Sequence, residues 1–165
     1  VTKKFDAQLI AQCGINCGTC VGFIGYTMSG KRRKHACVGC RTRASLCAFV
    51  KRKCKSLANK ETVEFCFECS DFPCELMERI EKTYTQRYDL SLIGNLNNIK
   101  EKGMEAFLEH EKERWICPTC GGVICIHTKR CYNCNPWLIF SWLVLCKTLD
   151  NQRASWPKTV EGPTN

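Results

Sequence analysis

The sequence has few of the residues that enzymes use for general catalysis. It contains only three histidines among 165 residues, and all three lie outside the cysteine knuckles. No Ser-His-Asp order, glycine-rich phosphate loop or paired-carboxylate motif stands out. Catalytic zinc normally keeps an open coordination position beside a general base, with histidine or carboxylate among its ligands. An enzyme is therefore the least favoured class of function.

The sequence also has little apolar material outside its cysteines. The apolar fraction of 44% includes 16 cysteines, and small domains with thin cores usually need metals or disulfides to stay folded. The first six residues contain no apolar segment of the kind a secretion signal needs. A C-x2-C turn aims two thiolates at one point, which suits a metal better than a structural disulfide. We therefore expect a metal-binding protein in a reducing compartment, the cytoplasm.

One apolar run stands near the C-terminus. Trp137 to Cys146 is interrupted only by Ser141. Ten residues cannot span a bilayer, which needs about twenty, so we expect no transmembrane span. A buried helix, a membrane-surface patch and a partner-binding segment all remain open for this run, and the polar tail after it should be loosely held.

Acidic residues are missing from residues 31–60, which hold eleven Lys or Arg. This asymmetry predicts a surface for an anionic partner, either nucleic acid or an acidic protein. The alternative is a solvated loop whose charge balances metal-bound thiolates. Aromatic side chains that stack on bases are sparse in residues 31–55, where Phe49 is the only one. The candidate anion-binding residues are Lys31, Arg32, Arg33, Lys34, Lys51, Arg52 and Lys53.

Ten cysteines lie between Cys13 and Cys74, enough for two four-ligand sites with two left over. One pairing joins the two C-x2-C knuckles, Cys37 and Cys40 with Cys66 and Cys69. The other site then takes Cys13, Cys17, Cys20 and Cys74, and Cys47 and Cys54 remain as possible extra ligands. Chain order alone does not decide between this pairing and interleaved ones.

The N-terminal spacing C-x3-C-x2-C leaves a second metal open. An iron–sulfur cluster on Cys13, Cys17 and Cys20 plus one more thiolate would make the protein a redox or electron-transfer protein, because thiolate-only sites suit either metal. The same spacing occurs in radical enzymes that use S-adenosylmethionine. Those enzymes need about 200 residues or more of barrel, which this chain lacks.

Apolar residues recur at three- and four-residue steps after Cys74 and predict helices at 74–88, 91–102 and 104–114, with Gly103 as a stop or kink.

The spacing of the next cysteines predicts a zinc ribbon after these helices. Its first knuckle is Cys117-Pro-Thr-Cys120-Gly-Gly, and ten residues separate Cys120 from the second knuckle, Cys131 and Cys134. Residues 123–126 should form a ribbon strand. Cys125 and His127 would point the same way along it, as face-filling residues or as spare ligands.

The order of these cysteines resembles the uncharacterised cysteine-rich family known as domain of unknown function 3795. The resemblance covers about residues 10–135. It rests on Cys13-Gly14, Cys37-Val38-Gly39-Cys40, Arg52-Lys53-Cys54, Phe72-Pro73-Cys74 and the ribbon with Ile124-Cys125 and His127. The resemblance implies a zinc-binding prokaryotic protein and supplies no reaction. The apolar tail departs from the family.

These observations predict a small α+β metal-stabilised fold with short hairpins and short helices. We expect a cysteine-rich domain at 1–82, a helical connector at 83–114, a zinc ribbon at 115–136, and an apolar segment with a loose tail at 137–165. The expected cofactor is zinc, about three ions at four thiolates each. The expected function is a structural zinc-binding interaction module, and the alternative is an iron–sulfur or thiol redox protein.

Overall fold

In the part of the chain that the structure describes, the fold consists of two longer helices and several single turns of helix. A computed structural model describes residues 4–42, 54 and 63–134. Three 3-10 turns, η2 (Ala7–Leu9), η3 (Cys17–Thr19) and η4 (Cys66–Glu68), and the short helix α1 (Val21–Ile24) carry the cysteine-rich region. The helices α4 (Glu75–Tyr88) and α5 (Leu92–Trp115) follow them. Cys47, Lys51, Arg52, Lys53 and the apolar run 137–146 lie outside the described residues.

The junction between α4 and α5 is fixed by side chains that cap the second helix. The Oγ of Ser91 accepts a hydrogen bond from the Gly94 amide at 2.8 Å. The Glu81 carboxylate on α4 accepts from the amides of Leu92 and Ile93 at 2.6 and 2.9 Å. These amides have no partner within their own helix, and a negative charge at a helix N-terminus is favourable. One acidic side chain of α4 therefore sets where α5 begins.

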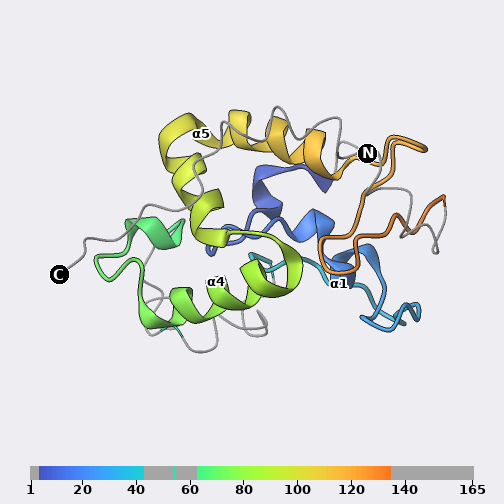
Figure 1. The fold of residues 1–165 in the computed structure, drawn as a ribbon, viewed down its shortest axis with the longest axis horizontal. Coiled ribbons are helices and arrows are strands. Elements are labelled where there is room, and N and C mark those ends of the chain that lie inside the picture. The colour runs from blue at the N-terminus through green and yellow to red at the C-terminus, as the bar shows by residue number, and fades with distance from the viewer. Residues whose placement is uncertain (1–3, 43–53, 55–62, 135–165) are drawn as a thin grey trace.

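The predicted break at Gly103 is confirmed as a kink. Gly103 has φ 84° and ψ 167°, outside the helical region, and α5 continues on both sides of it. Glycine suits this position because a positive φ is strained for other residues. The kink bends α5 over the N-terminal segment, which Figure 1 shows in blue between α4 and the second half of α5.

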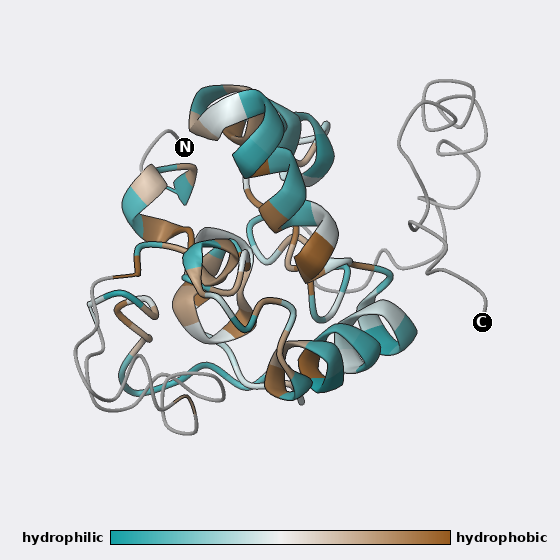
Figure 2. Ribbon diagram, turned by 90° about the vertical axis from the view of Figure 1, so that its left-hand side faces the viewer, coloured by the Kyte–Doolittle hydropathy of each residue, from teal (hydrophilic) through white to brown (hydrophobic). Residues whose placement is uncertain are grey.

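The core lies where the N-terminal segment meets the two helices. Ile10, Leu92, Leu96 and Phe107 are fully buried, and the side-chain amide of Asn95 donates to the Gly14 carbonyl at 2.9 Å. Both helices are largely hydrophilic, as their teal colour in Figure 2 shows. Only part of each helix surface therefore contributes to the core, which agrees with the thin core expected from composition.

The expected β component is weaker than the sequence suggested. In residues 4–42, 54 and 63–134, extended pairing is limited to isolated bridges, among them Ile116 with Val123 and Ile124 with Cys131 in the ribbon. The strand expected at 123–126 is thus two single bridges. The described part of the chain is small and helix-rich, and α5 is longer than the short helices expected.

None of the helices in the described part of the chain combines the length and the apolar character needed to cross a bilayer.

Candidate metal centre

The ribbon follows directly from the end of α5. The backbone turns back at the first knuckle, where the Cys117 amide donates to the Gly122 carbonyl at 2.7 Å, and again in the insert between the knuckles, where the Cys125 amide donates to the Arg130 carbonyl at 2.8 Å. The Ile124 amide donates to the Trp115 carbonyl at 2.8 Å. Gly121 permits the first turn because its φ is +65°. The two knuckles therefore face each other with their sulfur atoms converging.

The four sulfur atoms form one compact cluster. Those of Cys117 and Cys134 are 3.6 Å apart, and those of Cys120 and Cys131 are 3.5 Å apart. All four lie within 4.8 Å of one another. A tetrahedral ion with metal–sulfur bonds of about 2.3 Å holds its ligands about 3.8 Å apart. The donor set and its spacing therefore fit a single tetrahedral metal ion.

Backbone amides point at the sulfurs of this cluster. Burial opposes ionisation of Cys117, but hydrogen bonds from the amides of Cys120 and Thr119 help to lower the pKa of its thiol to about 7. The Gly122 amide donates to the Cys120 sulfur at 3.4 Å. Amide donors stabilise the thiolate, which is the form that binds metal. The first knuckle is thus prepared to hold a deprotonated Cys117. In the second knuckle, burial raises the pKa of the Cys131 thiol, and contacts with the Cys120 and Cys117 sulfurs raise the pKa of Cys134 to about 12.

The N-terminal cysteines fall into two neighbourhoods. Burial raises the pKa of the Cys66 thiol, and nearby thiols raise it further; these belong to Cys13, Cys54, Cys74 and Cys69. Burial also raises the pKa of the Cys20 thiol, and Cys125 and Cys37 add to that rise. The cysteine clusters of the chain indicate metal binding. Outside the ribbon, no set of three possible ligands in the described residues has all its ligand atoms within 4.8 Å.

These neighbourhoods cut across the pairing set out from the sequence, whose ligand sets stay a prediction. Cys37 lies beside Cys20, and Cys66 lies beside Cys13, Cys54 and Cys74 as well as its expected partner Cys69. Cys54, one of the two cysteines left over, is therefore among the Cys66 neighbours. Cys47 lies outside the described residues.

Cys125 and His127 join the ribbon to the N-terminal segment. Cys125 is fully buried. The Nδ1 of His127 accepts a hydrogen bond from the Val21 amide at 3.3 Å, and its Nε2 lies 3.2 Å from the Tyr84 hydroxyl. Burial and the nearby Lys129 lower the pKa of His127 to about 4. Both residues therefore lie at the contact between the ribbon and the N-terminal segment. Their role as face-filling residues or spare ligands stays a prediction.

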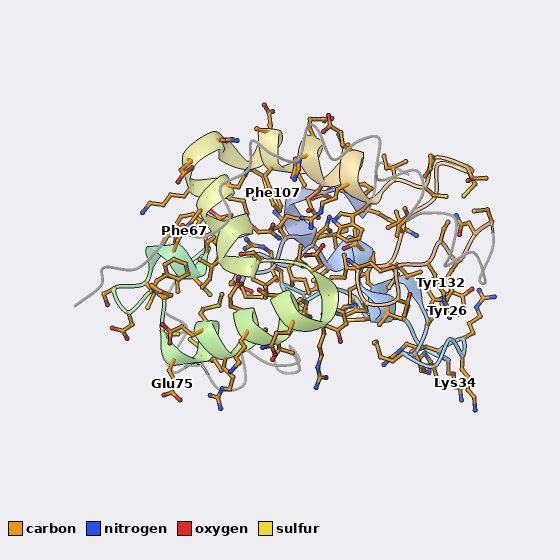
Figure 3. All side chains as sticks on the ribbon, in the orientation of Figure 1. Tyr26, Lys34, Phe67, Glu75, Phe107 and Tyr132 are labelled. Atoms are coloured by element: carbon orange, nitrogen blue, oxygen red, sulfur yellow. The ribbon has the colours of Figure 1, made fainter. Side chains whose placement is uncertain are left out.

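The described anion-binding candidates lie on a hairpin that follows α1. Tyr26 bridges Arg32 across it, and Lys31, Arg32, Arg33 and Lys34 are all exposed. Tyr26 stacks on Tyr132 of the second ribbon knuckle with ring centroids 4.0 Å apart. Figure 3 shows Tyr26, Tyr132 and Lys34 at the same end of the molecule.

Two features of the site were missed in the sequence. The Tyr26–Tyr132 stack places aromatic rings on the hairpin and the ribbon although few aromatics are near the basic residues in the chain. The buried pair Asn16 and Glu111 joins the first cysteine segment to α5 through a 3.1 Å hydrogen bond. Neither carries a local pattern, because each contact joins residues about a hundred positions apart.

Comparison with known proteins identifies one family. No curated protein and no solved structure matches the chain. The family described as Protein of unknown function (DUF3795) matches residues 9–79. The matched residues hold all ten N-terminal cysteines, and the ribbon cluster lies after them. The resemblance of the cysteine-rich region to this family is therefore confirmed over residues 9–79.

Proposed function

We propose that this protein is a structural zinc-binding interaction module whose basic hairpin binds nucleic acid. The observation that carries the proposal is the cluster of Cys117, Cys120, Cys131 and Cys134, whose sulfurs lie within 4.8 Å of one another. An iron–sulfur cluster binds its cysteines through different iron atoms, and this requires wider sulfur separations. The close spacing favours one tetrahedral ion, and zinc has no redox chemistry of its own. Its contribution here is to hold the two knuckles together.

The hairpin supports the choice of an anionic partner. Four consecutive cationic side chains, Lys31 to Lys34, are exposed and make an electrostatic footprint for phosphate groups. The Tyr26–Tyr132 stack beside them ties the hairpin to the ribbon. A metal-bound ribbon would therefore fix the position of the basic hairpin. Nucleic acid is favoured over an acidic protein because cationic and aromatic side chains together suit phosphates and bases.

Salt dependence tests this proposal. Binding of a single-stranded oligonucleotide should weaken as salt rises, with a slope that counts phosphate contacts at about 0.7 each. Changing Lys31, Arg32, Arg33 and Lys34 to Gln should weaken binding and reduce the slope by roughly three. The matched control removes four exposed charges elsewhere, at Arg79, Lys82, Arg87 and Lys100.

The control has the same net charge as the hairpin variant and should retain most of the slope. Equal losses in both variants would show that only net charge matters. Absent or salt-independent binding by the wild type would overturn the proposal, and binding of an acidic peptide in place of nucleic acid would assign the hairpin to a protein partner.

A further inference from the structure

The basic hairpin brings two N-terminal knuckles together at its base. The Thr27 amide donates to the Lys31 carbonyl, and the Arg33 amide donates to the Gly25 carbonyl, each at 2.8 Å. The ladder ends where the Cys37 amide donates to the Gly22 carbonyl, also at 2.8 Å. A β-carbon added at Gly22 would lie 3.6 Å from the Cys37 β-carbon and 3.9 Å from the Cys20 sulfur. Cys20 and Cys37 therefore flank the same glycine.

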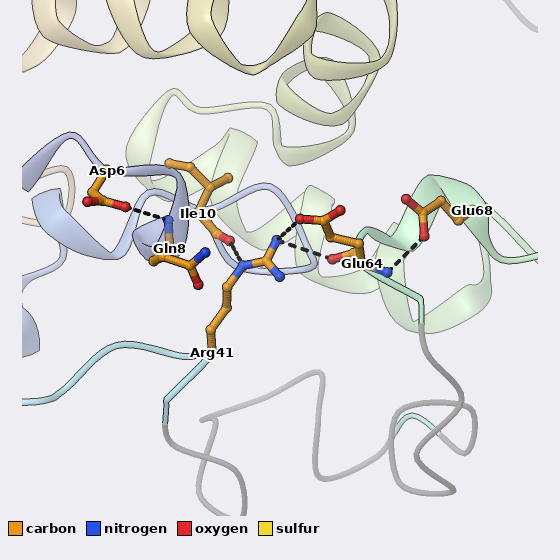
Figure 4. Close-up of polar contacts among 6 residues, drawn as sticks. All are labelled: Asp6, Gln8, Ile10, Arg41, Glu64 and Glu68. Atoms are coloured by element: carbon orange, nitrogen blue, oxygen red, sulfur yellow. Dashed lines mark hydrogen bonds and ion pairs between the residues drawn. The ribbon is translucent and has the colours of Figure 1, made fainter.

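A second contact joins the outer cysteines of the same knuckles. The Cys40 amide donates to the Cys17 sulfur at 3.2 Å. The next residue, Arg41, holds this segment in place, because its Nε donates to the Ile10 carbonyl at 2.6 Å and its Nη2 donates to the Glu64 carbonyl at 3.3 Å (Figure 4). The backbone of Cys40 therefore contacts the Cys17 sulfur, while the Cys20 sulfur and the Cys37 β-carbon lie near the same glycine.

The sulfurs of these knuckles have the surroundings of metal ligands. The Cys17 sulfur accepts from a backbone amide, as the Cys120 sulfur does in the ribbon. Burial raises the pKa of the Cys20 thiol, and the backbone amides of Gly22 and Phe23 oppose that rise. The spacing repeats as well. Residues 21–36 separate two C-x2-C knuckles, and an interval of about 15 to 20 residues between such knuckles is typical of zinc sites.

We propose that Cys17, Cys20, Cys37 and Cys40 bind a second metal ion as a tetrathiolate site of the zinc type, separate from the ribbon. Each thiol would give up its proton on binding. The metal would draw the four sulfurs to a separation of about 3.8 Å. This assignment replaces the pairing of Cys37 and Cys40 with Cys66 and Cys69 by one that the hairpin ladder and the Cys40–Cys17 contact support.

The proposed site would hold together the two ends of residues 21–36, the segment that carries Lys31 to Lys34. Four thiolates and one Zn²⁺ have a net charge of about −2, which Lys31 to Lys34 would more than offset nearby. Metal binding at this site does not depend on whether the protein binds nucleic acid. Only the role of the site in presenting the hairpin rests on the proposed function. Cys125 is the competing ligand, because it also lies near Cys20.

Stepwise zinc release from the wild-type protein tests the ligand set without mutation. Under anaerobic conditions a chelator removes zinc, and an alkylating reagent labels the cysteines that become free, which mass spectrometry then maps. Cys17, Cys20, Cys37 and Cys40 should become reactive as one set. Release of Cys37 and Cys40 together with Cys66 and Cys69, or of Cys125 in place of Cys40, would overturn the assignment.

Two variants provide the matched comparison. Cys40→Ser should lower the zinc content by one ion per chain, while Cys125→Ala, which changes the buried neighbour of Cys20, should leave it unchanged. An unchanged count in Cys40→Ser, or a loss in Cys125→Ala alone, would contradict the proposal. If Cys40→Ser loses zinc but keeps salt-dependent oligonucleotide binding, the site stands and its role in presenting the hairpin falls. If the wild type binds zinc but no oligonucleotide, only the proposed function falls.

Discussion

The side-chain amide of Asn16 donates a hydrogen bond to the Glu111 carboxylate at 3.1 Å. Both residues are almost fully buried. Asn16 also accepts from the Gly18 amide at 2.9 Å, and Glu111 accepts from the Trp115 indole at 3.2 Å. A chain of polar contacts therefore runs from the Cys17 turn to the last residue of α5, where the ribbon begins. It adds to two direct hydrogen bonds between the cysteine-bearing regions, in which the Ile126 amide donates to the Thr19 carbonyl at 3.0 Å and the Val21 amide donates to the His127 Nδ1 at 3.3 Å.

Removing the carboxylate of Glu111 should destabilise the protein. Glu111→Ala leaves two buried donors, on Asn16 and Trp115, without an acceptor, and we expect a loss of about 3 kcal/mol in the free energy of unfolding. Glu111→Gln keeps one acceptor oxygen and should lose about 1 kcal/mol. Denaturant unfolding of the zinc-loaded protein measures both. Equal stability of Glu111→Ala and the wild type would show that the contact contributes nothing.

The buried His127 predicts a pH dependence. Its pKa falls from an ordinary value near 6.5 to about 4, so the unfolded chain binds a proton in this range that the folded chain does not. His127 therefore contributes stability that is present above pH 6.5 and is lost as the pH falls towards 4, at up to about 1.4 kcal/mol per pH unit.

His127→Asn is the variant that isolates this effect, because the Asn oxygen can still accept from the Val21 amide. Acid also releases zinc from thiolates, but that loss is common to both proteins. The difference between wild type and variant in unfolding free energy should therefore shrink between pH 6.5 and 4.5. A difference that stays constant across this range would contradict the lowered pKa of His127.

Two neighbouring glycines should respond differently to alanine. A β-carbon at Gly18 would lie 1.8 Å from the Lys4 carbonyl oxygen, whereas one at Gly22 meets nothing closer than 3.6 Å. Overpacking of this kind costs about 1–3 kcal/mol, and the Gly18 clash is with backbone, so we expect the upper end for Gly18→Ala. Gly22→Ala should change stability by less than about 1 kcal/mol. Thermal unfolding of both variants checks this, and the reverse order would be incompatible with the structure.

The Tyr26–Tyr132 stack should couple the hairpin to the ribbon. A double-mutant cycle of Tyr26→Ala and Tyr132→Ala isolates the interaction, and aromatic pairs of this kind give about 0.5–1.5 kcal/mol beyond their burial. Tyr132→Phe should keep most of this coupling because the ring remains. A coupling energy of zero in the zinc-loaded protein would mean that the hairpin is held independently of the ribbon.

The sequence was sufficient for the features that depend on local patterns. The apolar periodicity after Cys74 predicted α4 and both halves of α5, and Gly103 marked the kink. The spacing of Cys117, Cys120, Cys131 and Cys134 predicted the four-sulfur cluster. In each case the interacting residues lie within a few turns of helix or within one short ribbon, so the chemistry and the spacing are visible together.

The features that depend on long-range contacts were beyond the sequence. The pairing that we propose for the N-terminal cysteines depends on the hairpin that turns at Gly30, where φ is +83°, and on the contact between Cys17 and Cys40. Several pairings were equally compatible with the sequence, because nothing local to a cysteine indicates which other cysteines share its metal ion. The β content was overestimated, since alternating residues at 123–126 form single bridges only.

The central claim is that the ribbon cysteines hold one zinc ion, and metal analysis of protein purified without oxygen tests it most directly. Cys134→Ser should contain one zinc per chain less than the wild type, and neither protein should absorb visible light. An unchanged zinc content in Cys134→Ser would contradict the claim. So would iron in the wild type, with broad absorbance near about 400 nm, that is lost in Cys134→Ser, because that loss would assign these thiolates to an iron–sulfur site.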